Sequence, residues 1–273
     1  MTQVIVHAGF HKTGTSSLQD YFRKIRHRLP DGIAVHLKED FLDAGNLARR
    51  YGQRPYPWRR RRFARALRRY LATVDERPVH ILSWEGFSGI MPGHRRLTGP
   101  VRNIRRAAIP LAHTIIAELR RRFGPEVEIT FLYTLREPES WLRSVHGHLL
   151  RSIRLTEDFD RFRAGFAAPI RLDDEAARIA LAIAPLPVVT SWLDDTKQRH
   201  EGPAAALLDL LDLPESLRAT LPPAQKTNAG NSDEIRAQCL ALNLSVGDDR
   251  ELKRLKDALT GFNRPAQRAA ARR

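Results

Sequence analysis

Residues 3–19 constrain the fold more than any other stretch of the chain. The apolar run Val4–Val6 leads into a turn that holds Gly9 and Gly14, and Leu18 then opens a helical pattern. Four hydroxyl residues lie in the same stretch: Thr13, Thr15, Ser16 and Ser17. At a helix start after a glycine turn, backbone N–H groups without helical partners can meet an anion. The order strand, glycine loop, helix therefore predicts an α/β fold with an anion-binding loop after its first strand.

The position of the lysine in this loop decides what kind of loop it is. A nucleotide-hydrolysing P-loop follows the pattern G-x-x-x-x-G-K-[ST]. Gly9 and Gly14 have the right separation, but Thr15 stands where that lysine would be, and Lys12 comes two residues before the second glycine. We therefore expect a phosphate cradle whose cation precedes the second glycine.

A second anion-binding pattern follows the apolar run 129–133. Arg136 comes at the expected strand end, Pro138 two residues later and Ser144 eight residues after the arginine. A guanidinium can form two parallel hydrogen bonds to a phosphate. Proline suits the first turn of a helix, where its missing N–H is not needed. The pattern predicts a strand, a phosphate-binding arginine and a helix that begins near Pro138.

Together the two motifs resemble the donor site of the sulfotransferases that use 3'-phosphoadenosine 5'-phosphosulfate (PAPS). In that family a lysine followed by Ser/Thr, Gly and two hydroxyl residues grips the 5' end of the donor. An arginine and a serine spaced like Arg136 and Ser144 hold its 3'-phosphate. The resemblance covers residues 1–150 well and is thin beyond them. A plain capped turn and a surface salt bridge of Arg136 are the structural alternatives.

The resemblance implies a role for each matched residue. Lys12 would neutralise charge that develops on the bridging oxygen, and Arg136 and Ser144 would hold the 3'-phosphate. The N–H groups of residues 13–16, with the hydroxyls of Thr15 and Ser16, would hold the 5'-phosphate. The implied donor-binding set is Gly9, Lys12, Thr13, Gly14, Thr15, Ser16, Arg136 and Ser144. PAPS is the expected donor and 3',5'-ADP (PAP) the expected product.

The acceptor also needs a base, and three residues qualify. Glu85 follows the apolar run 79–83, at a position that faces the acceptor in related carbohydrate sulfotransferases. His11 stands beside Lys12, and His7 ends the first strand. We rank Glu85 first and His11 second, so that the expected catalytic residues are Lys12, Glu85 and His11. A salt-bridged Glu85 and a surface His11 are equally compatible with the sequence.

Apolar runs separated by helical spacing predict the rest of the fold. We expect strands at 4–7, 79–83, 129–134 and 186–190, and helices at 59–71 and 102–123. Alternation of this kind is typical of a doubly wound parallel sheet flanked by helices, a P-loop-like three-layer sandwich. Ligands bind such sheets at the carboxyl ends of the strands. We expect one domain over residues 1–262 and a basic, disordered tail over 263–273.

Composition sets further limits. There are 46 Lys and Arg residues against 31 Asp and Glu, a net charge of +15, which favours anionic partners. A single cysteine, Cys239, excludes an internal disulfide framework and is expected in a buried helix face. We see no leader pattern and no apolar run of about 18 residues, and expect a cytoplasmic, bacterial protein. No metal is expected, because neither the second expected strand (79–83) nor the third (129–134) leads into the aspartate that holds Mg²⁺ in P-loop enzymes.

The leading hypothesis is a PAPS-dependent sulfotransferase acting on a hydroxyl or amine of a glycan or small metabolite. A P-loop small-molecule kinase is one rival, but the shifted lysine weighs against it. The other rival is a basic nucleic-acid-binding protein with a degenerate nucleotide fold. No recognisable nucleic-acid module is present, so no nucleic acid is expected as a partner.

Two segments stay open at this stage. The run Arg59–Arg62 is read first as a solvated helix face and second as a site for an acidic acceptor. The glycine-rich C-terminal segment of aryl sulfotransferases is missing, and Lys226, Asn228 and Asn231 are candidates to replace it. The acceptor itself has no sequence signature.

Overall fold

The computed structural model describes residues 1–41, 43–96, 99–166, 168–225 and 232–261. The chain forms two compact units. The first comprises Met1–Pro138 and Ile170–Asn228, and the second Glu139–Pro169 and Ala229–Arg273.

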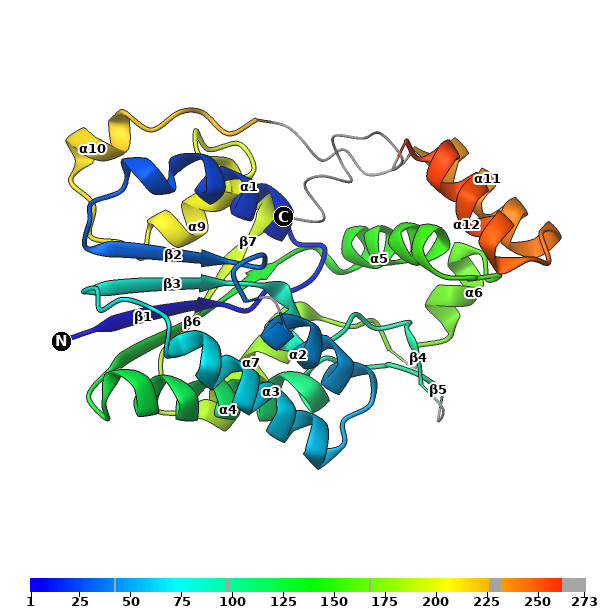
Figure 1. Cartoon of the computed structure of the whole chain (residues 1–273). Coiled ribbons are helices and arrows are strands. Elements are labelled where there is room, and N and C mark those ends of the chain that lie inside the picture. The colour runs from blue at the N-terminus through cyan, green and yellow to red at the C-terminus, as the bar shows by residue number, and fades with distance from the viewer. Residues whose placement is uncertain (42, 97–98, 167, 226–231, 262–273) are drawn as a thin grey trace. The chain divides into compact units, whose positions relative to one another are not determined.

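A five-stranded parallel sheet is the centre of the first unit, with strand order β2-β3-β1-β6-β7 (Figure 1). The strands are β1 (Gln3–His7), β2 (Ile33–Leu37), β3 (Val79–Ser83), β6 (Glu128–Leu135) and β7 (Val188–Trp192). β1 lies in the middle, and its last residue, His7, pairs with Ser83 on one side and Leu132 on the other. The loops after β1, β3 and β6 therefore leave the sheet side by side at its carboxyl edge.

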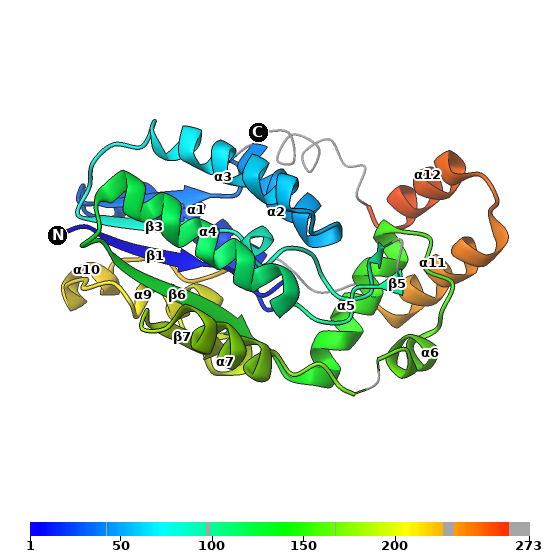
Figure 2. The same cartoon turned by 90° about the horizontal axis from the view of Figure 1, so that it is seen from below.

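Helices cover both faces of this sheet, as Figures 1 and 2 show, with α1 and α9 on one face and α3, α4 and α7 on the other. The longer helices of the unit are α1 (Thr15–Ile25), α2 (Asp43–Gln53), α3 (Pro57–Leu71), α4 (Arg105–Phe123) and α7 (Leu172–Ile183). Its short elements are η1 (Arg26–Arg28), η2 (Glu85–Ser88), β4 (Arg95–Arg96), β5 (Gly99–Pro100), α8 (Leu193–Thr196), η3 (Gly202–Ala204), α9 (Ala205–Leu208) and α10 (Glu215–Ala219). The three layers confirm the predicted sandwich.

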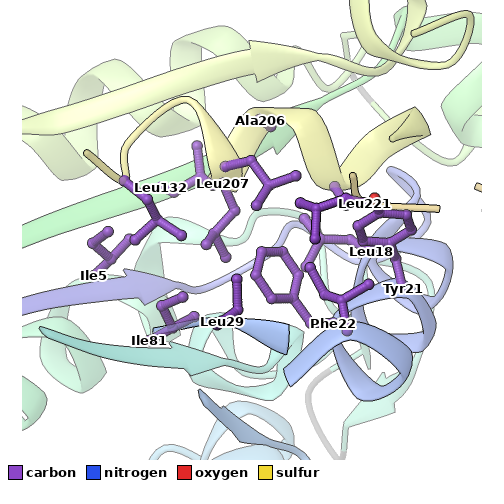
Figure 3. Packing of buried hydrophobic residues seen from close by; sticks show 14 of the residues in the cluster. Ile5, Leu18, Tyr21, Phe22, Leu29, Ile81, Leu132, Ala206, Leu207 and Leu221 are labelled. Carbon is purple, nitrogen blue, oxygen red and sulfur yellow. The ribbon is translucent and has the colours of Figure 1, made fainter. Parts of the chain in front are cut away.

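A hydrophobic core joins α1 to the sheet (Figure 3). Leu18 and Phe22 lie one turn apart on α1 and are fully buried together with Ile5 of β1 and Leu132 of β6. Leu207 of α9 closes the cluster. Because Leu18, in the first turn of α1, is packed in this way, the start of α1 is fixed at the carboxyl edge of β1.

The predicted strands are confirmed within two residues at each end, and the two predicted helices begin two or three residues from their expected starts. One strand of the five-stranded sheet was missed, as were the two-residue strands β4 and β5. β2 has four half-buried residues and only Leu37 is fully buried, so Ile33–Leu37 lacks the continuous apolar run of a central strand. In the described part of the chain, no helix combines the length and the apolar character that crossing a membrane requires.

The second unit is helical in its described part. Its helices are α5 (Pro138–Ser152), which starts on the last residue of the first unit, α6 (Phe159–Ala164), α11 (Asp233–Ser245) and α12 (Asp249–Leu259). Pro138 opens α5, as predicted. Cys239 is buried on α11, also as predicted. The expected tail over 263–273 lies outside the described residues.

Candidate active site

The loop between β1 and α1 bends through three left-handed positions. Gly9 has φ +107° and Gly14 has φ +89°. Lys12 has φ +67°, a value that residues other than glycine rarely adopt. The positive φ of Gly14 favours glycine at this position, and a Cβ there would also crowd a Leu193 methyl carbon at 2.8 Å. The backbone at Lys12 is held in a conformation that a relaxed loop would avoid.

Carbonyl groups of this loop are bonded to the protein itself. The acceptors and their side-chain donors are Ala8 with Ser88 (2.6 Å), Gly9 with Thr134 (3.1 Å), Phe10 with Thr13 (2.6 Å) and Lys12 with Arg136 (3.3 Å). Because these oxygens are turned into the protein, they do not repel an anion at the loop. The α1 end of the loop therefore presents mainly N–H groups to a ligand.

Helix α1 begins directly after the loop and is left open for an anion. Gly14 precedes it and provides no side-chain cap, and its first turn contains no acidic residue. The first hydrogen bond within the helix runs from the Leu18 N–H to the Gly14 carbonyl. The N–H groups of Thr15 and Ser16 come before this bond, at the open end of the helix. Ser16 is exposed, whereas Thr15 is buried.

The side chain of Thr13 bonds within the protein and does not reach the outer surface of the loop. Its side chain is fully buried, and its hydroxyl lies 2.6 Å from that of Thr134 while also donating to the Phe10 carbonyl. Only the backbone of Thr13 is left for the role expected of it. Thr134 was not singled out from the sequence, because a threonine inside an apolar strand gives no signal of a loop contact 121 positions away.

The two predicted motifs meet at the sheet edge. Arg136 leaves β6, the neighbour of β1, and its Nη1 donates to the Lys12 carbonyl at 3.3 Å. The guanidinium therefore lies against the loop that carries the lysine, although 124 positions separate the two residues. Ser144, the partner expected for Arg136, lies on the second turn of α5 in the second unit.

Glu85 stands at the start of η2, directly after β3, and is half-buried. The amide of Gln19 on α1 donates to its carboxylate at 3.1 Å and to the Ser83 carbonyl at 3.3 Å. A Cβ on Gly9 would lie 3.2 Å from the Cβ of Glu85, so glycine at that position lets the carboxylate approach the loop. Gln19, which is 1% exposed, was missed because a glutamine on an amphipathic helix has no distinctive pattern.

His11 is held in one tautomer. Its Nε2 lies 3.2 Å from the Gly89 carbonyl, which can only accept, so Nε2 carries the proton and Nδ1 the lone pair. Burial lowers the pKa of His11 below 6.5; the Glu85 carboxylate and the Gly89 carbonyl raise this pKa, and the charges of Arg49 and Lys12 lower it. The net direction is downward, so the neutral imidazole is favoured at neutral pH.

Two further histidines of the first unit are also kept neutral. His7 is fully buried on β1 and bonds to the Ser83 hydroxyl at 2.7 Å, and burial lowers its pKa to about 4. Burial, with the charges of Arg49 and His11, lowers the pKa of His94 to about 4. His94 and Arg49 were not predicted, since neither belongs to a motif.

Helix α2 supports this arrangement by close backbone contact. A Cβ on Gly52 would lie 2.7 Å from the Cα of Gly89, whose carbonyl fixes His11. A Cβ on Gly45 would overlap the ring of Trp84, the residue just before Glu85. Two glycines thus allow α2 to lie directly against the segment that follows β3.

Three of the residues singled out from the sequence have no described position. Lys226, Asn228 and Asn231 lie outside the described residues. Within the described ranges, no group of three or more His, Cys, Asp or Glu side chains is arranged to hold a metal ion.

Comparison with known proteins points to one family. The sulfotransferase domain family matches residues 3–170, which include both motifs and Glu85. No curated protein matches the chain. A solved structure from a study of the PezAT chromosomal toxin-antitoxin system of Streptococcus pneumoniae is 11% identical, with a TM-score of 0.31, over 90% of this chain and 88% of the other. A likeness at that level bears on neither fold nor function.

Proposed function

This chain belongs to the sulfotransferase domain family, and we propose that it transfers a sulfuryl group from PAPS to a hydroxyl or amine of a glycan or small metabolite. One observation carries the proposal: the guanidinium of Arg136 lies against the carbonyl of Lys12. Two anion-binding groups, one from each motif, thereby share one edge of the sheet. A donor with phosphates at both ends of a nucleoside needs such a pair.

The residues present suit this donor. The 5'-phosphate would lie against the N–H groups of residues 13–16, where loop carbonyls point away and α1 has no cap of its own. Arg136 would take the 3'-phosphate with paired N–H donors. When bound, PAPS supplies an activated sulfuryl group on a phosphate leaving group.

Transfer requires that a new bond form from the acceptor oxygen or nitrogen to sulfur while the sulfur–oxygen bond to the phosphate breaks. The electron pair of the broken bond stays on the phosphate oxygen, and the acceptor's proton passes to a base. We assign Lys12 to the charge that grows on that oxygen, as an electrostatic stabiliser. Its left-handed backbone, held through the Lys12 carbonyl, supports a fixed placement of the residue.

For the base we place His11 ahead of Glu85, reversing the order that the sequence favoured. The lone pair of His11 is on Nδ1, so the ring can accept a proton without changing tautomer. The Glu85 carboxylate raises the pKa of His11 and would stabilise the imidazolium that results. The other candidate, His7, is fully buried and bonded to Ser83.

Ligand-induced stabilisation tests the donor assignment directly. Because a ligand that binds only the folded chain raises its melting temperature, we expect 3',5'-ADP to do so and ATP with Mg²⁺ to have little effect. The reverse pattern would favour the kinase. Mass spectrometry after incubation with ³⁴S-labelled PAPS and a panel of oligosaccharides and metabolites identifies the sulfated product.

The pH dependence of kcat/KM tests the base. If His11 must be neutral, kcat/KM falls tenfold per pH unit below the pKa of His11, which lies under 6.5, and is flat at neutral pH. His11→Asn should remove this acid limb along with most turnover, whereas Glu85→Gln should move the limb to lower pH. An unchanged limb in His11→Asn would return the role to Glu85.

A further inference from the structure

Helix α3 carries a straight exposed row of basic side chains with an aromatic residue at its start. At 3.6 residues per turn, five side chains fall in a sector about 100° wide, and this row extends over roughly 16 Å. We call it the arginine stripe: Trp58, Arg61, Arg62, Arg65 and Arg69. All five are exposed, and the opposite side of the helix is buried through Phe63 and Leu67.

No ion pair with a described residue neutralises the charges of the stripe. Arg68, beside the stripe, forms a two-bond pair with Glu118 at 2.9 Å. Across the described ranges, none of the four arginines of the stripe takes part in an ion pair. Four uncompensated guanidinium groups on one helix face repel one another, and a polyanion would relieve that repulsion.

A flat aromatic surface stands at the start of the stripe. The rings of Tyr56 and Trp58 are nearly parallel, at 11°, with centroids 6.2 Å apart. They are 46% and 49% exposed, and the guanidinium of Arg59 lies 4.9 Å from the Trp58 ring centroid. Large, rigid, half-exposed rings of this kind are surfaces for binding, since they offer apolar area together with a polar edge.

The aromatic end of the stripe comes shortly after the α2 residue that packs against the hydrogen-bond partner of His11. Gly52 of α2 contacts the backbone of Gly89, whose carbonyl holds His11, and Tyr56 follows Gly52 by only four residues. α3 then leads back toward the start of β3, which is parallel to β1 (Figure 1). The stripe therefore begins at the carboxyl edge of the sheet and leads away from it.

We propose that the arginine stripe binds a chain-like anionic acceptor, namely a polysaccharide that carries carboxylate or sulfate groups. The proposal rests on the proposed sulfotransfer and names its acceptor class. Guanidinium groups bind carboxylate and sulfate oxygens in pairs, the two rings stack on sugar faces, and the stripe is longer than a single sugar ring. The end of the polysaccharide that passes Tyr56 and Trp58 would reach the site of His11.

Two other polyanions fit the stripe less well. A membrane-bound amphipathic helix inserts its apolar face into the bilayer, but the apolar face of α3 is buried in the protein core. Single-stranded nucleic acid is bound by aromatic side chains that stack on successive bases. The stripe has aromatic rings only at its start.

Binding of defined oligosaccharides tests the proposal without any donor. The probes are a heparin hexasaccharide, a hexagalacturonate, neutral maltohexaose, a thymidine dodecanucleotide, and phosphatidylglycerol–phosphatidylcholine vesicles, all at physiological ionic strength. The test variant is Arg61→Gln/Arg65→Gln/Arg69→Gln. A matched control, Arg106→Gln/Arg178→Gln/Arg250→Gln, removes the same charge from three exposed arginines on other helices.

We expect an anionic hexasaccharide to bind, maltohexaose not to bind, and the stripe variant to weaken binding at least about tenfold. The control variant should weaken it less than about threefold, because it changes only the overall field. Trp58→Ala, which leaves the charge unchanged, should also weaken binding several-fold. Melting curves establish that each variant is folded, and the three single substitutions replace the triple variant if it is not.

Equal losses in the stripe and control variants would overturn the proposal. So would tighter, stripe-dependent binding of the dodecanucleotide or of the vesicles. The response of the stripe variant to 3',5'-ADP separates the two proposals: retained donor binding with no glycan binding removes only the acceptor class. Stripe-dependent glycan binding by a protein that ignores 3',5'-ADP would instead overturn the proposed sulfotransfer.

Discussion

Helix starts differ between the two units of the chain. In the second unit, α6, α11 and α12 are capped from within: Asp158, Ser232 and Asp248 each accept an N–H of the first turn. In the first unit, α1 starts after Gly14 with no side-chain cap and no acidic residue in its first turn. A cap of this kind is worth about 1 kcal/mol of stability.

Two other uncapped starts in the first unit, those of α4 and α7, have acidic side chains of the protein beside them. The N–H groups of Ile104 and Arg105 at the start of α4 both bond to the carboxylate of Glu175. α7 has Asp173, Asp174 and Glu175 in its first turn. The first turn of α1 has no such acidic residue, and an incoming anion would supply the charge. α3 also starts without a cap or an acidic residue, so what sets α1 apart is an open start that follows a glycine loop.

At the carboxyl ends of helices in the second unit, cationic side chains of the protein bond to backbone carbonyls. The ammonium of Lys256, 4% exposed, donates to the carbonyls of Leu150 and Ile153 at the end of α5 and to the Asn243 side chain. Arg154 donates to the carbonyls of Val246 and Gly247 after α11. These cations are already bonded to the protein and serve its stability.

The largest effect is expected at Lys12. Lys12→Ala should lower turnover about 10² to 10³-fold, because it removes the cation assigned to the leaving oxygen, and should leave the melting temperature nearly unchanged. Lys24→Ala, at the far end of α1, is the control and should keep full activity. Steady-state kinetics with PAPS measures both, and a fully active Lys12→Ala enzyme would break the distinction between the two regions.

Lys256→Met should lower the stability of the fold and leave donor binding unchanged. It removes one donor from the Asn243 oxygen and one of the donors to each of the Leu150 and Ile153 carbonyls, so the free energy of unfolding should fall by about 1–3 kcal/mol. Urea denaturation measures the loss, and Lys253→Met, on the exposed side of α12, should change stability by less than about 0.5 kcal/mol. Affinity for 3',5'-ADP measured on the folded fraction should stay the same.

Arg136→Ala tests the contribution of the guanidinium to donor binding. Loss of charge-assisted hydrogen bonds to a phosphate should weaken 3',5'-ADP binding about 10- to 100-fold by calorimetry. Arg136→Lys should recover only part, because an ammonium cannot form the paired bonds. Unchanged affinity in the alanine variant would remove Arg136 from the donor site.

The smallest effect is expected at a protein-capped helix start. Asp248→Ala should lower the free energy of unfolding by about 1 kcal/mol, and Asp248→Asn, which keeps an acceptor for the Glu251 N–H, should lower it by much less. Neither should alter turnover. A marked loss of donor affinity in Asp248→Ala would contradict a purely stabilising role.

β1, β3 and β6 were predictable because nearly all of their residues are buried and appear as short apolar runs. β7 was predicted from its valines although none of its residues is fully buried, and β2 was missed because His36 interrupts its short apolar run. The motif residues of the loop and Arg136 were predictable from type and spacing, because phosphate chemistry demands glycines and a guanidinium at set distances. Gln19 and Thr134 act through contacts across 66 and 121 positions, and such contacts have no local pattern.

The sequence by itself determined that an anion-binding loop follows the first strand, that an arginine ends another strand, and that α/β alternation connects them. These features depend on local backbone preference and residue chemistry. Tertiary structure alone decided that the guanidinium of Arg136 lies on the Lys12 carbonyl and that Gly89 fixes the tautomer of His11. Both facts follow from strand order and close glycine packing, because these bring together groups that are far apart along the chain.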